Sequence, residues 1–313
     1  MEEYIITESD VREVLALHGL TAISFSKLPK SGQRQVFEVA FDPRKNGILK
    51  FVDVSPYQAH QRYAWNELSD SELEQEKAYE IDANSKRVIR ELKASKKCAI
   101  LPQLEIMDDY QIYTKQYNQF IYYFETKFEG QTLDKSELYH KEQGIDIVLQ
   151  FLFQMVNQIK VMHDAGYVHR DLTPRNIIYH QGQFKIIDAG LVKSNEEEKL
   201  TATRAVIGTP YYMAPEQSKR TSDYTWDFRT DLFAVGLIAT EIFLPQTRYL
   251  DRENKRDIHY IFQIWKSKDP SSRSLNLFGK IIARLAVEQR SRRWADLDNL
   301  LHELEALIGK EDE

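Results

Sequence analysis

The sequence has little cysteine, no long apolar run and no surplus of basic charge. Cys98 is the single cysteine among 313 residues, which excludes an internal disulfide framework and is typical of a reducing compartment. No apolar run approaches the roughly 20 residues needed to cross a bilayer. The acidic start MEEYIITESD also lacks the features of a secretory signal. We therefore expect a cytoplasmic protein that does not enter a membrane.

The charge balance limits the partners of the chain. It has 42 basic and 48 acidic residues, a net charge of −6, and so lacks the basic surface that nucleic-acid binding requires. A hydrophobic content of 42% with 29% charged residues is typical of a folded globular protein. No repeat, low-complexity tract or Pro/Gly/Ser linker separates independent domains, so we expect a single domain over residues 1–313.

The first part of the chain has the patterns of a small antiparallel sheet. Short β-rich runs separated by turn residues predict strands at 22–28, 36–41 and 47–54. A polar, glutamate-rich stretch at 57–97 is typical of a helix. Two further strand-like runs, at 98–106 and 119–128, complete a predicted sheet with one or two helices.

From about Gly144 the pattern becomes helical. Apolar residues recur at three- and four-residue steps until the chain reaches Asp164, which predicts one long amphipathic helix. Two short strands with HQGQ between them predict a hairpin at 176–188. Further helices are predicted at 230–244 and 294–308, and their apolar stripes indicate core packing.

A polar loop after the long helix carries side chains suited to chemistry. The segment VHRDLTPRNII places Asp171 and Asn176 five positions apart, and Asp188 ends the hairpin that follows. Carboxylate and carboxamide oxygens are hard ligands of the kind that Mg²⁺ accepts alongside substrate phosphates. Gly190 permits a backbone turn just after Asp188, so that its carboxylate can point outward.

Three motifs in order resemble those of one known family. VHRDLTPRN, IIDAG and GTPYYMAPEQ are similar to the catalytic loop, metal-binding triplet and substrate-docking loop of eukaryotic-like (Hanks-type) serine/threonine protein kinases, including bacterial members. The resemblance implies an α+β, bilobal fold, with a small antiparallel-sheet N-lobe at about 1–126 and a larger, mainly helical C-lobe at about 127–313. It also implies ATP with Mg²⁺ or Mn²⁺ as cofactors, and proteins as substrates.

The resemblance assigns roles to single residues. Asp171 would accept the proton of the substrate hydroxyl, while Asn176 and Asp188 would hold the metal ions. Lys50 in GILKFVDV matches the strand lysine that contacts the nucleotide phosphates, and Glu91 is its expected helical partner. The alternative for Glu91 is a place on a solvated helix face.

Four more residues match structural positions of the family. Glu216, in the APE triplet, is expected to pair with Arg293 near the start of the last helix. Asp231 and Gly236, in DLFAVG, match the helix that braces the catalytic loop.

The glycine-rich loop departs from the family pattern. When the valine of G-x-G-x-x-G-x-V is aligned with Val36, Pro29, Ser31 and Arg34 stand at the glycine positions and Gly32 is out of register. Glycines there let backbone amides approach phosphate, so we expect looser ATP binding or a different use of Ser31 and Gly32. With Val36, these two remain the expected nucleotide-binding residues of the loop.

Two substitutions affect the expected chemistry. Thr173 replaces a lysine that contacts the transferring phosphate, and losing such a charge-assisted bond of about 1.5–3 kcal/mol would slow transfer roughly 10- to 100-fold. Arg175 is a candidate replacement, in an arrangement that resembles tyrosine kinases; the alternative is an arginine that pairs with a surface acid. Ala189 replaces the usual phenylalanine of the metal-binding triplet and removes an apolar contact beneath the helix of Glu91.

The segment LVKSNEEEKLTATRAVIGTP resembles an activation segment. Thr201 and Thr203 stand where bacterial relatives autophosphorylate, and Arg170 is expected to pair with a phosphorylated residue there. Thr209, within GTPYYMAPE, is typical of serine/threonine rather than tyrosine kinases.

Two other functions stay open at this point. A small-molecule phosphotransferase shares the Asp, Asn and Asp core but lacks a segment that ends in APE. A pseudokinase or nucleotide-binding scaffold is suggested by the altered glycine loop, Thr173 and Ala189. The physiological substrate and the oligomeric state are not specified by any residue.

Overall fold

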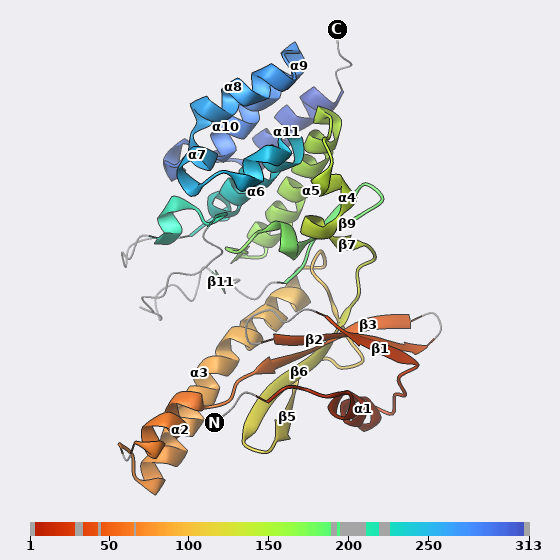
Figure 1. Cartoon of the computed structure of the whole chain (residues 1–313), viewed down its shortest axis with the longest axis vertical. Coiled ribbons are helices and arrows are strands. Elements are labelled where there is room, and N and C mark those ends of the chain that lie inside the picture. Colours follow the sequence, from red (N-terminus) through yellow and green to blue (C-terminus); the bar gives the residue numbers. More distant parts are fainter. Residues whose placement is uncertain are drawn as a thin grey trace. The chain divides into compact units, whose positions relative to one another are not determined.

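The computed structural model describes residues 4–28, 34–42, 45–65, 67–188, 193–194, 211–218 and 226–309 (Figure 1). The chain divides into two compact units, Met1–Lys127 and Phe128–Glu313, a boundary next to the one expected near residue 126. The first unit contains an antiparallel sheet and the second is mainly helical, which confirms the predicted fold class.

The sheet of the first unit has the order β1-β2-β3-β6-β4, and β5 also pairs with β6. Its strands are β1 (Ser24–Lys27), β2 (Arg34–Asp42), β3 (Lys45–Asp53), β4 (Leu104–Glu105), β5 (Gln111–Lys115) and β6 (Asn118–Thr126). The predicted strands at 22–28, 36–41, 47–54 and 119–128 are therefore present. The run at 98–106 is wrong as a strand except at β4, and β5 was not predicted.

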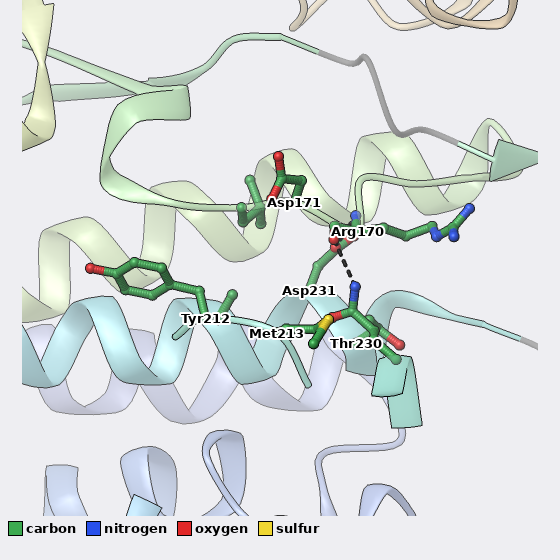
Figure 2. Close-up of a pocket in the computed structure, with 9 residues that line it drawn as sticks. Arg170, Asp171, Tyr212, Met213, Thr230 and Asp231 are labelled. Carbon is green, nitrogen blue, oxygen red and sulfur yellow. Dashed lines mark hydrogen bonds between the residues drawn. The ribbon is translucent and has the colours of Figure 1, made fainter. Parts of the chain in front are cut away.

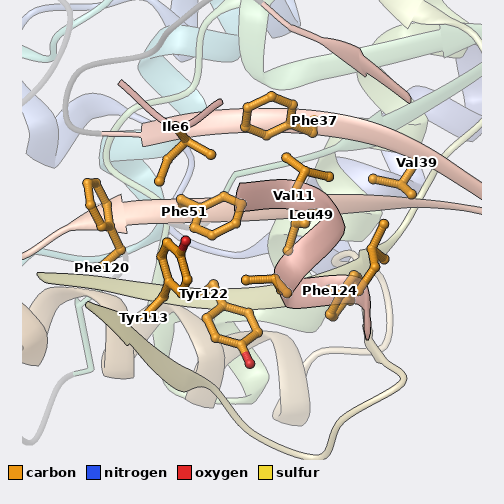
Figure 3. Packing of buried hydrophobic residues seen from close by; sticks show 12 residues of the cluster. Ile6, Val11, Phe37, Val39, Leu49, Phe51, Tyr113, Phe120, Tyr122 and Phe124 are labelled. Carbon is orange, nitrogen blue, oxygen red and sulfur yellow. The ribbon is translucent and has the colours of Figure 1, made fainter. Parts of the chain in front are cut away.

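Helix α1 (Glu8–Leu17) covers one face of this sheet (Figure 3). Its start is fixed by a capping box, in which Thr7 and Asp10 bond each other's backbone N–H groups. The helix and the sheet share one core cluster: Ile6, Val11, Val14, Leu15, Phe37, Val39, Leu49, Phe51, Tyr113, Phe120, Tyr122 and Phe124. Successive side chains of a strand point to opposite faces of the sheet, so the strand residues between the members of this cluster lie on the opposite face.

The opposite face packs against α3 (Asp70–Lys97), where Val88 and Leu92 contact Val52 and Ile121. The single helical stretch predicted at 57–97 is two helices, α2 (Tyr57–Ala64) and α3. They are separate because Ser69 and Glu72 form a capping box that starts α3 anew.

The second unit is built around α5 (Ile145–Asp164), which matches the predicted long helix. By length and composition α5 could cross a membrane, so the expectation that no apolar stretch approaches about 20 residues was wrong. Its apolar residues are buried against α6, α11 and β10, which is the environment of a core helix. The buried ones are Ile145, Val148, Leu149, Phe151, Leu152, Met155, Val156, Ile159 and Met162.

The described part of the second unit contains eighteen further elements in addition to α5. They are β7 (Gln131–Thr132), η1 (Leu133–Lys135), α4 (Glu137–His140), β8 (Tyr167–Val168), η2 (Pro174–Asn176), β9 (Ile177–His180), β10 (Gln183–Ile186), β11 (Lys193–Ser194), η3 (Pro215–Ser218), α6 (Phe228–Phe243), η4 (Pro245–Tyr249), α7 (Arg252–Arg256), α8 (Ile258–Lys268), α9 (Ser272–Asn276), η5 (Leu277–Ile282), α10 (Ala283–Leu285), η6 (Arg290–Arg292) and α11 (Leu297–Ile308).

The predicted hairpin is β9 and β10, joined at Gln181 and Gly182 with φ angles of 45° and 82°. Such a turn needs positive φ at both central residues, a conformation that glycine adopts without a steric penalty. The predicted helices at 230–244 and 294–308 are α6 and α11, and only their boundaries differ.

Candidate active site

The loop between β8 and β9 is fastened to α6 by one buried carboxylate. Asp231 accepts hydrogen bonds from the backbone N–H groups of His169, at 2.8 Å, and Arg170, at 2.7 Å. Burial raises the pKa of the Asp231 carboxyl, and the N–H groups and charges of His169 and Arg170 oppose that rise. Arg170 has φ 71°, a costly conformation for a residue with a side chain, and these bonds hold it there.

Asn176 connects the loop to the end of the hairpin. Its side-chain nitrogen donates to the backbone carbonyl of Asp171 at 2.8 Å, and its backbone carbonyl accepts from the N–H of Ile187 at 2.9 Å. Asp188 follows directly, with φ 62°. The segments that carry Asn176 and Asp188, two predicted metal ligands, are therefore linked by a backbone hydrogen bond.

The donor set fits a hard cation that takes part of its ligands from elsewhere. Asp188 and Asn176 offer a carboxylate and a carboxamide, which are oxygen ligands that Mg²⁺ accepts. Within the described ranges no group of three or more His, Cys, Asp or Glu side chains could hold a metal ion. Mg²⁺ at phosphate-transfer sites commonly binds one or two protein ligands together with substrate phosphates and water, and this pair meets that description.

A pocket lies beside the loop, between it and α6 (Figure 2). The side chains of Asp171 and Arg170 point in different directions there. Gln217 joins the pocket wall to the loop, since its side-chain nitrogen donates to the Arg170 carbonyl at 2.8 Å. The guanidinium of Arg170 lies over the Trp226 ring, 4.6 Å from its centroid.

Glu216 and Arg293, the pair expected from the sequence, form a two-point ion pair. The two terminal guanidinium nitrogens donate to the two carboxylate oxygens at 2.7 and 2.9 Å. Thr230, one residue before Asp231, donates its hydroxyl to the same carboxylate at 3.0 Å. The pair therefore ties the APE triplet to the start of α6, close to the residue that holds the loop.

Arg175 and Thr173 occupy contrasting environments. The Arg175 side chain is 84% exposed, and its Nε lies 3.7 Å from a carboxylate oxygen of Asp134. This arrangement favours the alternative of an arginine that pairs with a surface acid. Thr173 is buried, and its backbone carbonyl accepts the N–H of Asn176 at 2.9 Å, a bond that does not involve the threonine side chain.

In the first unit, Lys50 lies between two carboxylates. Its Nζ is 3.6 Å from Oε1 of Glu91 and 2.7 Å from Oε2 of Glu125. Glu91 is buried, so the solvated alternative does not apply to it. Its Oε2 accepts from Arg34 at 2.6 Å and its Oε1 from the Tyr123 hydroxyl at 3.1 Å.

Sequence reasoning missed Arg34 and Glu125 as members of this group. The available signal was strand alternation. Lys50 lies opposite Val36 on β2 and opposite Tyr123 on β6. Residues two positions along each strand, which include Arg34 and Glu125, therefore share the face of Lys50.

Six predicted residues lie outside the part of the chain that the structure describes. They are Ser31, Gly32, Ala189, Thr201, Thr203 and Thr209. Their assigned roles stay predictions. Val36, the remaining predicted residue of the nucleotide loop, is half-buried and lies across from Lys50.

Comparison with known families agrees with this geometry. The family model of the protein kinase domain matches residues 57–304, well over half of the chain, so the chain belongs to the protein kinase domain family. The resemblance to Hanks-type kinases is thereby confirmed. The matched region begins after β3, so Arg34 and Lys50 lie outside it.

Individual relatives are similar over parts of their length. A probable serine/threonine-protein kinase of Clostridium perfringens is 33% identical over 33% of this chain and 15% of its own length. The probable serine/threonine-protein kinase PknB of Lactococcus lactis is 23% identical over 55% of this chain and 28% of its own. Mitogen-activated protein kinase 13 of Arabidopsis thaliana is 26% identical over 62% of this chain and 52% of its own. The chain thus spans between 15% and 52% of these three relatives.

Proposed function

We propose that this chain is an ATP-dependent protein kinase that phosphorylates serine and threonine hydroxyls. The observation that carries the proposal is the loop of Asp171 and Asn176, whose backbone is fixed by the buried Asp231. A catalytic base must keep its position relative to the acceptor hydroxyl, and a loop bonded to a core helix meets that need.

Asp171 acts as the base in this proposal. Its carboxylate accepts the proton of the acceptor hydroxyl while the hydroxyl oxygen bonds to the γ-phosphorus. The bond between that phosphorus and the β–γ bridging oxygen breaks, and ADP leaves. A bound Mg²⁺ or Mn²⁺ neutralises charge on the phosphate oxygens. Asn176 and Asp188 would hold the cation, since the Asn176 nitrogen is engaged with the loop backbone and its oxygen is the end suited to a metal.

The acceptor class rests on sequence context and on relatives. Thr209 and the APE triplet are typical of serine/threonine kinases, and the two bacterial relatives described above carry that name. The exposed Arg175 weakens the one feature that resembled tyrosine kinases. Proteins are therefore the proposed substrates, with serine or threonine as the acceptor.

Autophosphorylation at Thr201 or Thr203 is part of the proposal. Arg170 is the expected partner of the phosphate, and its guanidinium stacks on the Trp226 ring. Peptide mass spectrometry after incubation with Mg-ATP tests this step. Active protein in which both threonines remain unmodified would contradict it.

One experiment tests the main proposal. The purified chain and an Asp171→Asn variant are incubated with Mg-ATP and casein, and phosphate incorporation is measured by intact mass. Transfer by the wild type alone supports the proposal. ATP turnover without protein labelling favours a small-molecule phosphotransferase, and nucleotide binding without turnover favours a scaffold.

The scaffold has one observation in its favour. Lys50, the residue expected to contact the nucleotide phosphates, lies closer to Glu125 than to Glu91. A lysine held by a neighbouring carboxylate is less available to phosphate.

A further inference from the structure

Four buried charged side chains from four elements meet on one face of the sheet in the first unit. Arg34 comes from β2, Lys50 from β3, Glu91 from α3 and Glu125 from β6. Their exposed fractions are only 6%, 7%, 1% and 3%. We call these four residues the charge tetrad. Two cations and two carboxylates balance, which is the condition under which charges are tolerated in an interior.

The distances divide the tetrad into two close pairs. Arg34 lies 2.6 Å from Glu91, and Lys50 lies 2.7 Å from Glu125. The contact between Lys50 and Glu91 is longer, at 3.6 Å, and Oε1 of Glu91 also accepts from Tyr123. Within the tetrad, Glu91 therefore lies closer to Arg34 than to Lys50, and Lys50 lies closer to Glu125 than to Glu91.

We infer that Glu125 is a positioning residue that competes with nucleotide phosphate for Lys50. The inference rests on the proposed function, since it requires ATP to present its phosphates to Lys50. A triphosphate brings additional negative charge to an ammonium group that already has a short contact with a carboxylate. Each Lys50 bond to phosphate therefore forms at the expense of the bond to Glu125, and ATP binds less tightly than it would without this competitor.

Arg34 makes the charge balance of Glu91 independent of the position of Lys50. Its guanidinium keeps Glu91 charge-compensated whether or not Lys50 moves toward phosphate. Lys50 can then move toward phosphate while Glu91 keeps its counter-charge, and the contact that is given up is the one with Glu125. Glu125 is the tetrad member whose charge sets the affinity for phosphate.

The test compares Glu125→Gln with the wild type and with a matched control, Glu38→Gln. Glu38 forms a pair of the same length, 2.7 Å from Lys127, with a side chain that is 33% exposed against 4% for Glu125. It lies on the same face of the sheet as Glu125, because both residues are opposite Ile48. Binding of Mg-ATP and of adenosine is measured by titration calorimetry for all three proteins. Adenosine has no phosphate, so its affinity reports the site without the competition.

We expect Glu125→Gln to bind Mg-ATP about 10-fold more tightly, equivalent to about 1.4 kcal/mol, with unchanged adenosine affinity. Glu38→Gln should match the wild type for both ligands. Equal ATP affinity in wild type and Glu125→Gln overturns the inference while leaving the proposed function intact. Weaker binding of both ligands would make Glu125 a purely structural residue and also overturns it.

The same measurements distinguish failure of the proposed function from failure of the inference about Glu125. Wild-type protein that binds neither ligand would refute the proposed function and the inference together. Glu125→Asp retains the charge on a shorter side chain, and we expect it to restore an ATP affinity closer to the wild type. If Glu125→Asp instead binds ATP as tightly as Glu125→Gln, charge competition is not the cause.

Discussion

Removal of the Glu216 carboxylate is expected to destabilise the second unit strongly. Arg293 is completely buried and donates two hydrogen bonds to that carboxylate. Glu216→Ala leaves the guanidinium without its counter-charge, and breaking a buried pair from one side costs about 3–5 kcal/mol. Arg293 also donates to the carbonyls of Arg229, Val287 and Glu288, which hold it inside and prevent relief by movement into water.

The loss is measured by thermal and urea unfolding of the full chain. For a domain of about 150–250 residues, each kcal/mol lowers Tm by about 2–4 °C, so Glu216→Ala should lower the Tm of the second unit by roughly 6–20 °C. The control is Glu137→Ala, which removes an exposed pair with Lys141 in which both side chains are more than half exposed. Such surface pairs contribute about 0–1 kcal/mol, so Tm should change little.

A double-mutant cycle decides whether the ion pair is the cause. Arg293→Met together with Glu216→Ala removes both charges, and replacing a buried pair by apolar groups is often nearly neutral. We expect the double variant to lose at least about 2 kcal/mol less than the sum of the single variants. Additive losses, or a Glu216→Ala variant as stable as Glu137→Ala, would refute this reasoning.

Three other predictions concern the packing of α6, the docking of α1 and the loop brace. Gly236→Ala places a Cβ 2.8 Å from the Cβ of Leu285, and we expect a loss of about 1–3 kcal/mol in urea unfolding, against almost none for Gly279→Ala, where nothing lies within 4 Å. Burial opposes ionisation of Asp10, yet hydrogen bonds from Thr7, Tyr113 and Lys115 hold the pKa of its carboxyl well below the ordinary value. The ionised carboxylate therefore stabilises the fold above about pH 4, and this stabilisation is lost as the pH falls. Asp10→Asn should flatten the acid side of a curve of Tm against pH. Asp231→Asn keeps one acceptor for the two loop N–H groups, so kcat should fall by 10-fold or more while KM for ATP changes little, as steady-state kinetics would show.

The elements that the sequence predicted best are those with a strong internal pattern. The apolar stripe of α5 repeats over five turns, and the hairpin of β9 and β10 has a glycine at a turn position with positive φ. Helix α1 was missed because its apolar face, Val11, Val14 and Leu15, is short and its polar start resembles an ordinary terminus. Its stability comes from the sheet beneath it, a contact that no local pattern encodes.

The candidate site also contains residues that a local motif predicts and residues that only the tertiary fold brings together. Asp171, Asn176 and Asp188 lie in contiguous motifs, and the sequence predicted their roles from the order and spacing of those motifs. The partners that hold the site come from distant segments. The Gln217 side chain reaches the Arg170 carbonyl across 47 positions, and Arg34 reaches Glu91 across 57. These pairings depend on the tertiary fold, so strand alternation can indicate that Arg34 shares a face with Lys50 but not that it bonds Glu91.

The glycine loop is the point at which sequence and structure together say more than either alone. The family pattern places its third glycine at position 34, and the sequence alone presents Arg34 as a loss. The structure shows that this arginine binds Glu91 at 2.6 Å from a buried position. Lys50 lies closer to Glu125, at 2.7 Å, than to Glu91, at 3.6 Å. Arg34 and Glu125 therefore belong to one charge-balanced arrangement, and Arg34→Gly alone would leave the tetrad with an excess carboxylate.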